Sequence, residues 1–271
     1  MKLIAVIQFP GSNCEHETAN AVKRAGMDPR IFRWNKPPEE LKEFDGFVIP
    51  GGFSYQDRVR AGAVAAKKNI MRALLAESQK NKPVLGICNG AQILIESGIL
   101  PGITPGKVEM AIAPNRGRTG YYCNWIFMKT APVREKCAFT RGLAGDEIIP
   151  SPVAHAEGRF TTEDKTLLQK LRDNSQIVFR YASPTGEIDP DFPVNPNGST
   201  DSIAGLANPG GNVLGLMPHP ERAAFLRQVP DDLEGEYGNM KRSFRGDLGK
   251  MESPGPGMKL FQSMSEFLEE G

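Results

Sequence analysis

Short apolar runs alternate with helical segments along the first hundred residues, and this alternation constrains the fold more than any other feature. Strand follows helix at a spacing typical of a parallel sheet with helices on both of its faces. Strands are predicted at Leu3–Ile7, Ile31–Arg33, Gly46–Ile49 and Val84–Ile87, and helices at 15–25, Pro37–Glu43, Val64–Gln79 and from Ala91. Such sheets bind ligands beyond the carboxyl ends of their strands, so loops 9–16, 50–57 and 88–92 mark a candidate site.

The pattern changes at about residue 107. Antiparallel strands are predicted at 108–113, 121–129 and 148–154, then a helix at 163–171, strands at 177–181, 203–207 and 213–217, and a last helix at 258–268. No linker divides the chain, so we expect one α/β domain over 1–271, with a mostly parallel central sheet and a small antiparallel sheet. Turn residues crowd 183–200 and 227–257, which are predicted to be loop insertions.

Composition narrows the class of protein. The 271 residues hold 33 Lys and Arg against 32 Asp and Glu, a net charge of +1 that weighs against nucleic acid as the partner. No apolar run approaches the ~20 residues that span a bilayer, so no membrane is expected. Four cysteines without a CxxC pair favour a reducing cytoplasm, and no cluster has the spacing of metal ligands.

The segment around Cys88 carries the strongest chemical signal. An apolar strand runs into Gly86-Ile87-Cys88-Asn89-Gly90, and a helix follows. This is the cysteine form of a nucleophile elbow, in which a strained turn projects the nucleophile from the edge of the sheet. The two glycines are expected where tight strand–helix packing leaves no room for a Cβ. The helix N-terminus favours thiolate, and the Asn89 N–H would point to a developing oxyanion.

A base is available at the end of another strand. His219 follows the apolar run at 213–217, and Glu221 lies two residues further on, where its carboxylate could orient the imidazole. The second oxyanion donor is expected from Gly52 in the Pro50-Gly51-Gly52-Phe53 loop, because glycine lets the backbone approach a ligand closely. Taken alone, His219 could be an ordinary loop histidine, and the loop with Gly52 could be an ordinary glycine-containing turn.

These motifs together resemble the class I glutamine amidotransferases, which implies a flavodoxin-like α/β fold. The closer resemblance is to the family of glutaminase subunits of phosphoribosylformylglycinamidine synthase. It rests on PGSNC at 10–14, PGGFSY at 50–55, PVLGICNG at 83–90, PVAHAEGRF at 152–160, NGSTDSIAGL at 197–206 and GNVLGLMPHPERA at 211–223. These segments span nearly the whole chain.

The resemblance implies a mechanism. Cys88 would attack the side-chain amide of glutamine, and the N–H groups of Gly52 and Asn89 would stabilise the tetrahedral intermediate. His219 would protonate the departing ammonia and later activate water against the thioester on Cys88. Gln92 and Phe53 are substrate-binding candidates, Gln92 because it shares a helix face with Cys88.

The resemblance also implies partners. The family delivers ammonia to a separate synthetase large subunit, which uses ATP and Mg to amidate formylglycinamide ribonucleotide in purine biosynthesis, and it has a small third subunit. We therefore expect no cofactor in this chain. The run GITPGK at 102–107 lacks the spacing of a phosphate-binding loop, which agrees with ATP chemistry on another chain.

Two departures from the family pattern stand out. Gln56 occupies a position where the family usually has glycine, which would strain the loop if the backbone there has positive φ. Residues 227–257 are longer than the usual link and, with five basic and six acidic residues, are interpreted as a near-neutral surface loop.

Other functions remain open at this stage. A cysteine peptidase-like or thiol-stress enzyme is the nearest alternative, although Gln92 and the HPE run disfavour it. A non-catalytic regulatory or redox subunit with an inert or sensing thiol is the alternative outside the enzymes. Cys14 is predicted to lie beside the same cleft, more simply as a packed cysteine than as a second functional thiol, and His155 is interpreted as a contact residue.

Overall fold

The computed structural model describes residues 1–117, 120–132 and 137–270, so 118–119, 133–136 and 271 of the predicted domain lie outside it. Its centre is a nine-stranded sheet in the order β2-β1-β3-β4-β11-β10-β9-β6-β7. The parallel part contains β2 (Asp28–Arg33), β1 (Leu3–Gln8), β3 (Gly46–Ile49), β4 (Val84–Ile87) and β11 (Val213–Leu216). The antiparallel part contains β10 (Ile203–Ala207), β9 (Ile177–Ala182), β6 (Tyr122–Thr130) and β7 (Ile148–His155).

The predicted α/β fold is confirmed. A separate two-stranded antiparallel sheet pairs β5 (Ala111–Pro114) with β8 (Glu157–Thr161), a strand that the sequence did not signal. The other antiparallel strands extend the main sheet. Strands β3, β4 and β11 are buried along their whole length, as expected for parallel strands covered on both faces.

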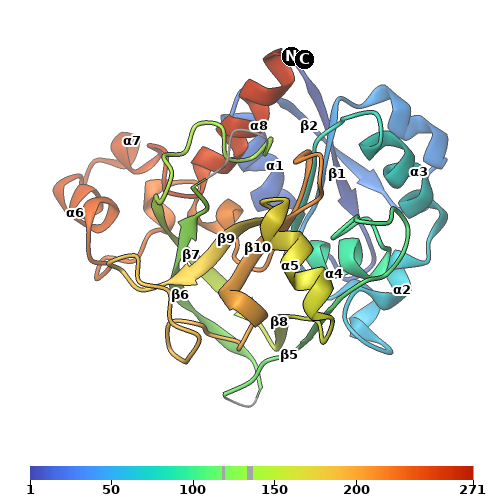
Figure 1. Ribbon diagram of the computed structural model, residues 1–271. Coiled ribbons are helices and arrows are strands. Elements are labelled where there is room, and N and C mark those ends of the chain that lie inside the picture. The colour runs from blue at the N-terminus through green and yellow to red at the C-terminus, as the bar shows by residue number, and fades with distance from the viewer. Residues whose placement is uncertain (118–119, 133–136, 271) are drawn as a thin grey trace.

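Helices cover the sheet on two sides. Figure 1 shows α1 and α8 on one side of the parallel strands and α3 and α4 on the other, with the two chain ends close together. The helices are α1 (Glu15–Arg24), α2 (Ala63–Ala66), α3 (Asn69–Ser78), α4 (Asn89–Glu96), α5 (Lys165–Asp173), α6 (Glu236–Ser243), α7 (Leu248–Met251) and α8 (Met258–Glu270). Short 3₁₀ turns are η1 (Pro38–Glu43), η2 (Ser54–Asp57), η3 (Thr200–Ser202), η4 (Pro220–Ala223) and η5 (Leu226–Gln228).

The structure has two helices where the sequence predicts one. The sequence predicts a single helix over Val64–Gln79, but α2 and α3 are separated at Lys68, whose backbone is extended (φ −76°, ψ 148°). The Lys68 ammonium lies 4.9 Å from the ring centroids of both Trp34 and Tyr55. These cation–π contacts connect the break to the loop after β3.

Residues 227–257 are not simply a loop, and this corrects the sequence interpretation. They contain α6 and α7, which Figure 1 shows at the margin of the molecule beside β6 and β7. Apolar side chains of this segment form a second small core that also receives two side chains of β6; its members are Leu226, Val229, Leu233, Tyr237, Met240, Phe244, Trp125 and Phe127. The apolar residues at 237, 240 and 244 have helical spacing. The interpretation as a surface loop rested on the charge count and did not use this spacing.

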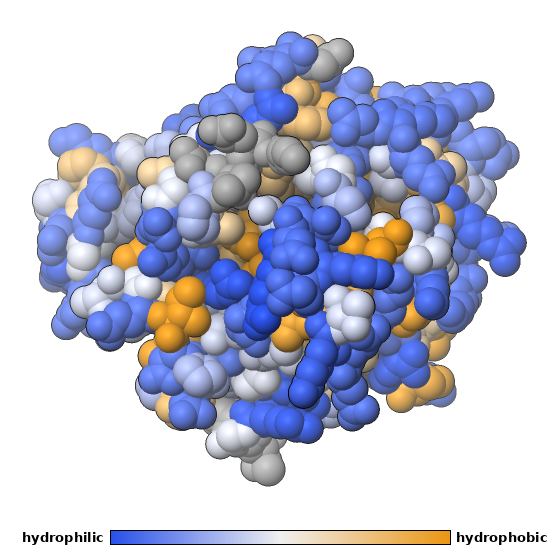
Figure 2. Space-filling model, viewed as in Figure 1, coloured by the Kyte–Doolittle hydropathy of each residue, from blue (hydrophilic) through white to orange (hydrophobic). Residues whose placement is uncertain are grey.

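The surface seen in Figure 2 is mostly hydrophilic, and its hydrophobic atoms lie in small separate patches. The charged outer face of α5 lies at the centre of that view. Among the described residues, no helix has the length and apolar character needed to cross a bilayer.

Candidate active site

Cys88 lies in a strained turn between β4 and α4. Its backbone has φ 50° and ψ −105°, a conformation that L-residues rarely adopt. The turn is tight on both sides. A Cβ on Gly90 would lie 2.1 Å from the Ile49 carbonyl oxygen, and one on Gly86 would lie 2.8 Å from the backbone of Gly90. The predicted need for glycine at both positions is confirmed.

His219 and Glu221 form a buried pair just beyond β11. Nδ1 of His219 lies 2.6 Å from Oε1 of Glu221, and the exposed fractions of the two side chains are 3% and 0%. Because the carboxylate can only accept, Nδ1 carries a proton, and Nε2 is the nitrogen left to exchange one. Burial alone would lower the pKa of His219, but Glu221 and Cys88 raise this pKa well above its ordinary value.

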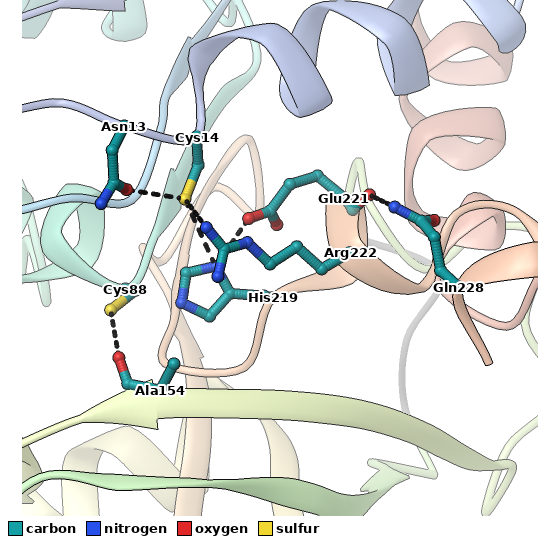
Figure 3. A network of polar contacts seen from close by, with 8 residues as sticks. All are labelled: Asn13, Cys14, Cys88, Ala154, His219, Glu221, Arg222 and Gln228. Atoms are coloured by element: carbon teal, nitrogen blue, oxygen red, sulfur yellow. Dashed lines mark hydrogen bonds and ion pairs between the residues drawn. The ribbon is translucent and has the colours of Figure 1, made fainter. Parts of the chain in front are cut away.

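Cys88 and His219 come from neighbouring parallel strands, β4 and β11. In Figure 3 the imidazole edge that carries Nε2 is turned toward Cys88. Nε2 makes no hydrogen bond among the described residues, and the Cys88 thiol instead lies 3.8 Å from the Ala154 carbonyl oxygen. Catalytic hydrogen bonds are often loose before substrate binds, and a small rotation of the thiol would redirect it.

The loop after β3 brings Gly52 to the same edge. Gly51 and Gly52 run beside the loop after β1, where Asn13 N–H donates to Gly51 O (3.2 Å) and Phe53 N–H donates to Gly11 O (2.8 Å). Gly52 has φ 149°, and its N–H makes no hydrogen bond with a described residue. The Asn89 N–H belongs to the first turn of α4 and has no partner within the helix. Both predicted oxyanion donors are therefore available.

The side chain of Asn89 organises a buried polar network around the elbow. Its Oδ1 accepts from Ser54 N–H (3.1 Å) and its Nδ2 donates to Gln92 Oε1 (2.8 Å). Gln92 Nε2 in turn donates to the carbonyl of Glu157 (2.6 Å). Gln92, predicted to bind substrate, thus connects α4 to β8, and each of its amide atoms retains capacity for one further hydrogen bond.

Phe53 and Tyr121 form an exposed pair of aromatic side chains. The Phe53 ring is 44% exposed and the Tyr121 ring 49%, and their centroids lie 6.3 Å apart. Burial, and then the charge of Cys88, raise the pKa of Tyr121. Nothing in the sequence around Tyr121 pointed to this position.

The predicted strain at Gln56 is present in the structure. Tyr55, Gln56 and Asp57 have φ of 54°, 59° and 50°, so three successive non-glycine residues are left-handed. Asp57 Oδ1 accepts from Asn89 Nδ2 at 3.5 Å. Burial and the charge of Glu157 raise the pKa of Asp57 to about 6.

His155 is buried beside the site and is neutral. Its Nδ1 lies 3.1 Å from Asn115 Oδ1, whose amide nitrogen donates to the His155 carbonyl, so Nδ1 is the protonated nitrogen. Burial, and then the nearby His219, lower the pKa of His155 to about 3.

Cys14, His219 and Glu221 bring donor atoms within 4.8 Å of one another, a grouping that could hold a metal ion. Sequence spacing could not show it, because Cys14 is 205 residues from His219. However, Arg222 donates from Nη2 to Cys14 Sγ at 3.1 Å. A positive charge of the chain itself already lies against this sulfur, which disfavours a cation there.

Comparison with known proteins agrees with this geometry. A family model described as a CobB/CobQ-like glutamine amidotransferase domain matches residues 2–268, and the chain belongs to that family. It is similar to proteins named phosphoribosylformylglycinamidine synthase subunit PurQ. The one from Methanothrix thermoacetophila is 51% identical over 98% of both chains, and the one from Pyrococcus furiosus is 44% identical over 83% of this chain and 90% of its own.

A solved structure supports the same relationship. The chain matches one from the structure of PurLQS of Thermotoga maritima with 30% identity and a TM-score of 0.71, covering 99% of this chain and all of the other. The active-site residues come from loops that this fold places at one edge of its sheet.

Proposed function

We propose that this chain is the glutaminase subunit of a phosphoribosylformylglycinamidine synthase, and that Cys88, His219 and Glu221 are its catalytic triad. The observation that carries the assignment is the strained Cys88 elbow beside a buried His219–Glu221 pair. The relatives' shared name supports the choice of enzyme, and the proposed pathway is de novo purine biosynthesis.

The proposed reaction proceeds in two halves. The Cys88 thiol gives its proton to His219 Nε2 as its sulfur attacks the side-chain carbonyl carbon of glutamine, and the Gly52 and Asn89 N–H groups stabilise the oxyanion that forms. His219 then gives its Nε2 proton to the departing nitrogen, so that ammonia leaves and a glutamyl thioester remains. In the second half His219 takes a proton from water, the water oxygen attacks the thioester, and glutamate leaves Cys88. Gln92 and Phe53 are proposed to contact the substrate.

The ammonia is proposed to pass to a separate synthetase large subunit, with a small third subunit completing the complex. The similar chain from Thermotoga maritima belongs to the structure of PurLQS, which supports this organisation. ATP and Mg would act on the large subunit, and no cofactor is proposed for this chain. Its four cysteines are free, which fits a reducing cytoplasm.

The test is glutamate release from glutamine by this chain, alone and with the two partner subunits, ATP and formylglycinamide ribonucleotide. We expect low activity alone and full activity in the complex. If partner contacts align the Gly52 N–H, they should mainly raise kcat; if they only improve glutamine binding, they should mainly lower KM. Full kcat in the isolated chain would exclude a switch in this loop.

A regulatory subunit with an inert thiol is the competing function. Iodoacetamide separates the two, because a thiolate paired with imidazolium reacts far faster than an ordinary cysteine at neutral pH. In addition, the complex that contains Cys88→Ala should still amidate when ammonium salt replaces glutamine. Failure with ammonia would point to a structural role for Cys88.

A further inference from the structure

Cys14 is a second buried thiol in the active site, and the proposed reaction does not use it. It is 1% exposed and lies at the start of α1, near the Nδ1 edge of the His219 ring, whereas Cys88 lies near the Nε2 edge. Its sulfur lies 4.0 Å from His219 Nδ1, and Figure 3 shows it at the meeting point of contacts from Asn13, Arg222 and His219.

The contacts of this sulfur are those of a neutral thiol. Its S–H donates to Asn13 Oδ1 at 3.1 Å, and its lone pairs accept from Arg222 Nη2 at 3.1 Å. Burial raises the pKa of Cys14 above its ordinary value, so the proton stays on sulfur at neutral pH. A buried protonated thiol is a poor nucleophile, so Cys14 is not suited to attack the substrate as a second nucleophile.

Cys14 also joins three loops that carry catalytic parts. Its backbone N–H donates to the carbonyl of Gly51 (3.3 Å), next to the oxyanion donor Gly52. Gly51 packs closely against both groups, because a Cβ there would be 2.7 Å from His219 Cε1 and 3.2 Å from Cys14 Sγ. The Gly51 backbone and the Cys14 sulfur thus both lie against the imidazole, whose Nδ1 is bound by Glu221.

We propose that Cys14 is a positioning residue for the triad: its thiol, held by Asn13 and Arg222, keeps the His219 imidazole aligned with Glu221 and with the oxyanion loop. This inference rests on the proposed glutaminase function. It assigns the thiol no proton transfer and no contact with substrate.

The test uses three substitutions in the assembled complex. Cys14→Ser keeps a group that donates to Asn13 and accepts from Arg222, Cys14→Val keeps bulk without polar contacts, and Cys14→Ala removes the sulfur. We expect kcat for glutamine hydrolysis to fall about 10- to 100-fold for Val and Ala with KM within about threefold, and serine to recover most of it. Cys137→Ala is the matched control, since Cys137 is also buried and is 4% exposed.

A second readout does not depend on turnover. Alkylation of Cys88 by iodoacetamide, located by mass spectrometry, should slow in Cys14→Val and Cys14→Ala but not in Cys137→Ala, because a displaced imidazole can no longer accept the proton of Cys88. If one substitution prevents folding, the remaining two still decide the question through kcat and alkylation.

Two results distinguish a failure of this inference from a failure of the proposed glutaminase function on which it rests. Equal kcat and equal alkylation rates for serine, valine and wild type would overturn the role of Cys14 while leaving the triad intact. Glutaminase activity that survives Cys88→Ala would overturn the triad itself, whatever Cys14 does. A loss confined to KM would also contradict positioning, because a misaligned base slows chemistry rather than binding.

Discussion

The backbone N–H of Cys88 donates a 2.8 Å hydrogen bond to the carbonyl of Leu216. This bond continues the parallel pairing of β4 with β11, in which Ile87 lies opposite Leu216. The elbow thus begins level with the end of the strand that leads to His219. The proposed nucleophile and base come from segments more than a hundred residues apart, and sheet register is what brings them to one place.

Cys88→Ala should abolish glutamine hydrolysis, with a loss of at least about 10³-fold in kcat, because no other group can form the thioester. The fold should survive, since the side chain loses only its sulfur. Cys137→Ala is the matched control, because Cys137 is another buried free cysteine. Glutamate release and a urea unfolding curve check both points. Retention of a tenth of the wild-type rate would contradict the assignment.

Glu221→Gln should impair hydrolysis less than His219→Ala. Glu221 orients the ring and stabilises its cation, whereas His219 carries the proton itself. We expect losses of about 10- to 10³-fold for Glu221→Gln and about 10⁴-fold for His219→Ala, measured as kcat in the complex. Equal losses would indicate that Glu221 does more than orient the imidazole.

Stability should depend on pH through His155. The pKa of His155 is lowered to about 3 in the folded chain, from an ordinary value of 6.5. The unfolded chain therefore binds a proton below pH 6.5 that the folded chain does not, and stability falls as pH falls through this window. Between pH 6.5 and 5.0 this one group can contribute up to about 2 kcal/mol.

His155→Gln removes this titration while an amide can still donate to Asn115. Urea unfolding at pH 7.5 and pH 5.0 measures the effect. The acid-induced loss of stability should be smaller in His155→Gln than in wild type, even if the variant is less stable at both values. His219, whose pKa is raised, contributes with the opposite sign in both proteins, and its charge is one cause of the lowered pKa of His155. An unchanged difference between the two pH values would show that His155 is protonated in the folded chain.

Gln56→Gly should stabilise the chain by about 0.5–1 kcal/mol, because glycine adopts φ 59° without the strain of a Cβ. Gln79→Gly is the matched control, since Gln79 has φ −67° and glycine there should be destabilising. Urea unfolding midpoints measure both. Destabilisation by Gln56→Gly would mean that side-chain contacts of Gln56 outweigh its backbone strain.

Local sequence determined the parts of the site that depend on neighbouring residues. The run from Pro83 to Gly90 specifies a buried strand, a turn without room for Cβ atoms and a helix start, and these together define an elbow. Likewise the two-residue spacing of His219 and Glu221 allows their hydrogen bond, because the chain is short between them. The apolar runs of β3, β4 and β11 have no other stable location than the centre of a sheet.

Tertiary structure decided what depends on pairing between distant segments. Cys14 meets His219 and Arg222 only because β1 and β11 end at the same edge of one sheet, and no local pattern specifies which strands become neighbours. The same holds for Tyr121 beside Phe53 and for Gln92 bonded to the Glu157 carbonyl. Helix α6 packs in the small core that includes Trp125 and Phe127 of β6. Charge counting within 227–257 could not reveal that partner. Sequence patterns report which face of an element is apolar, whereas the packing partner of that face is chosen by the whole fold.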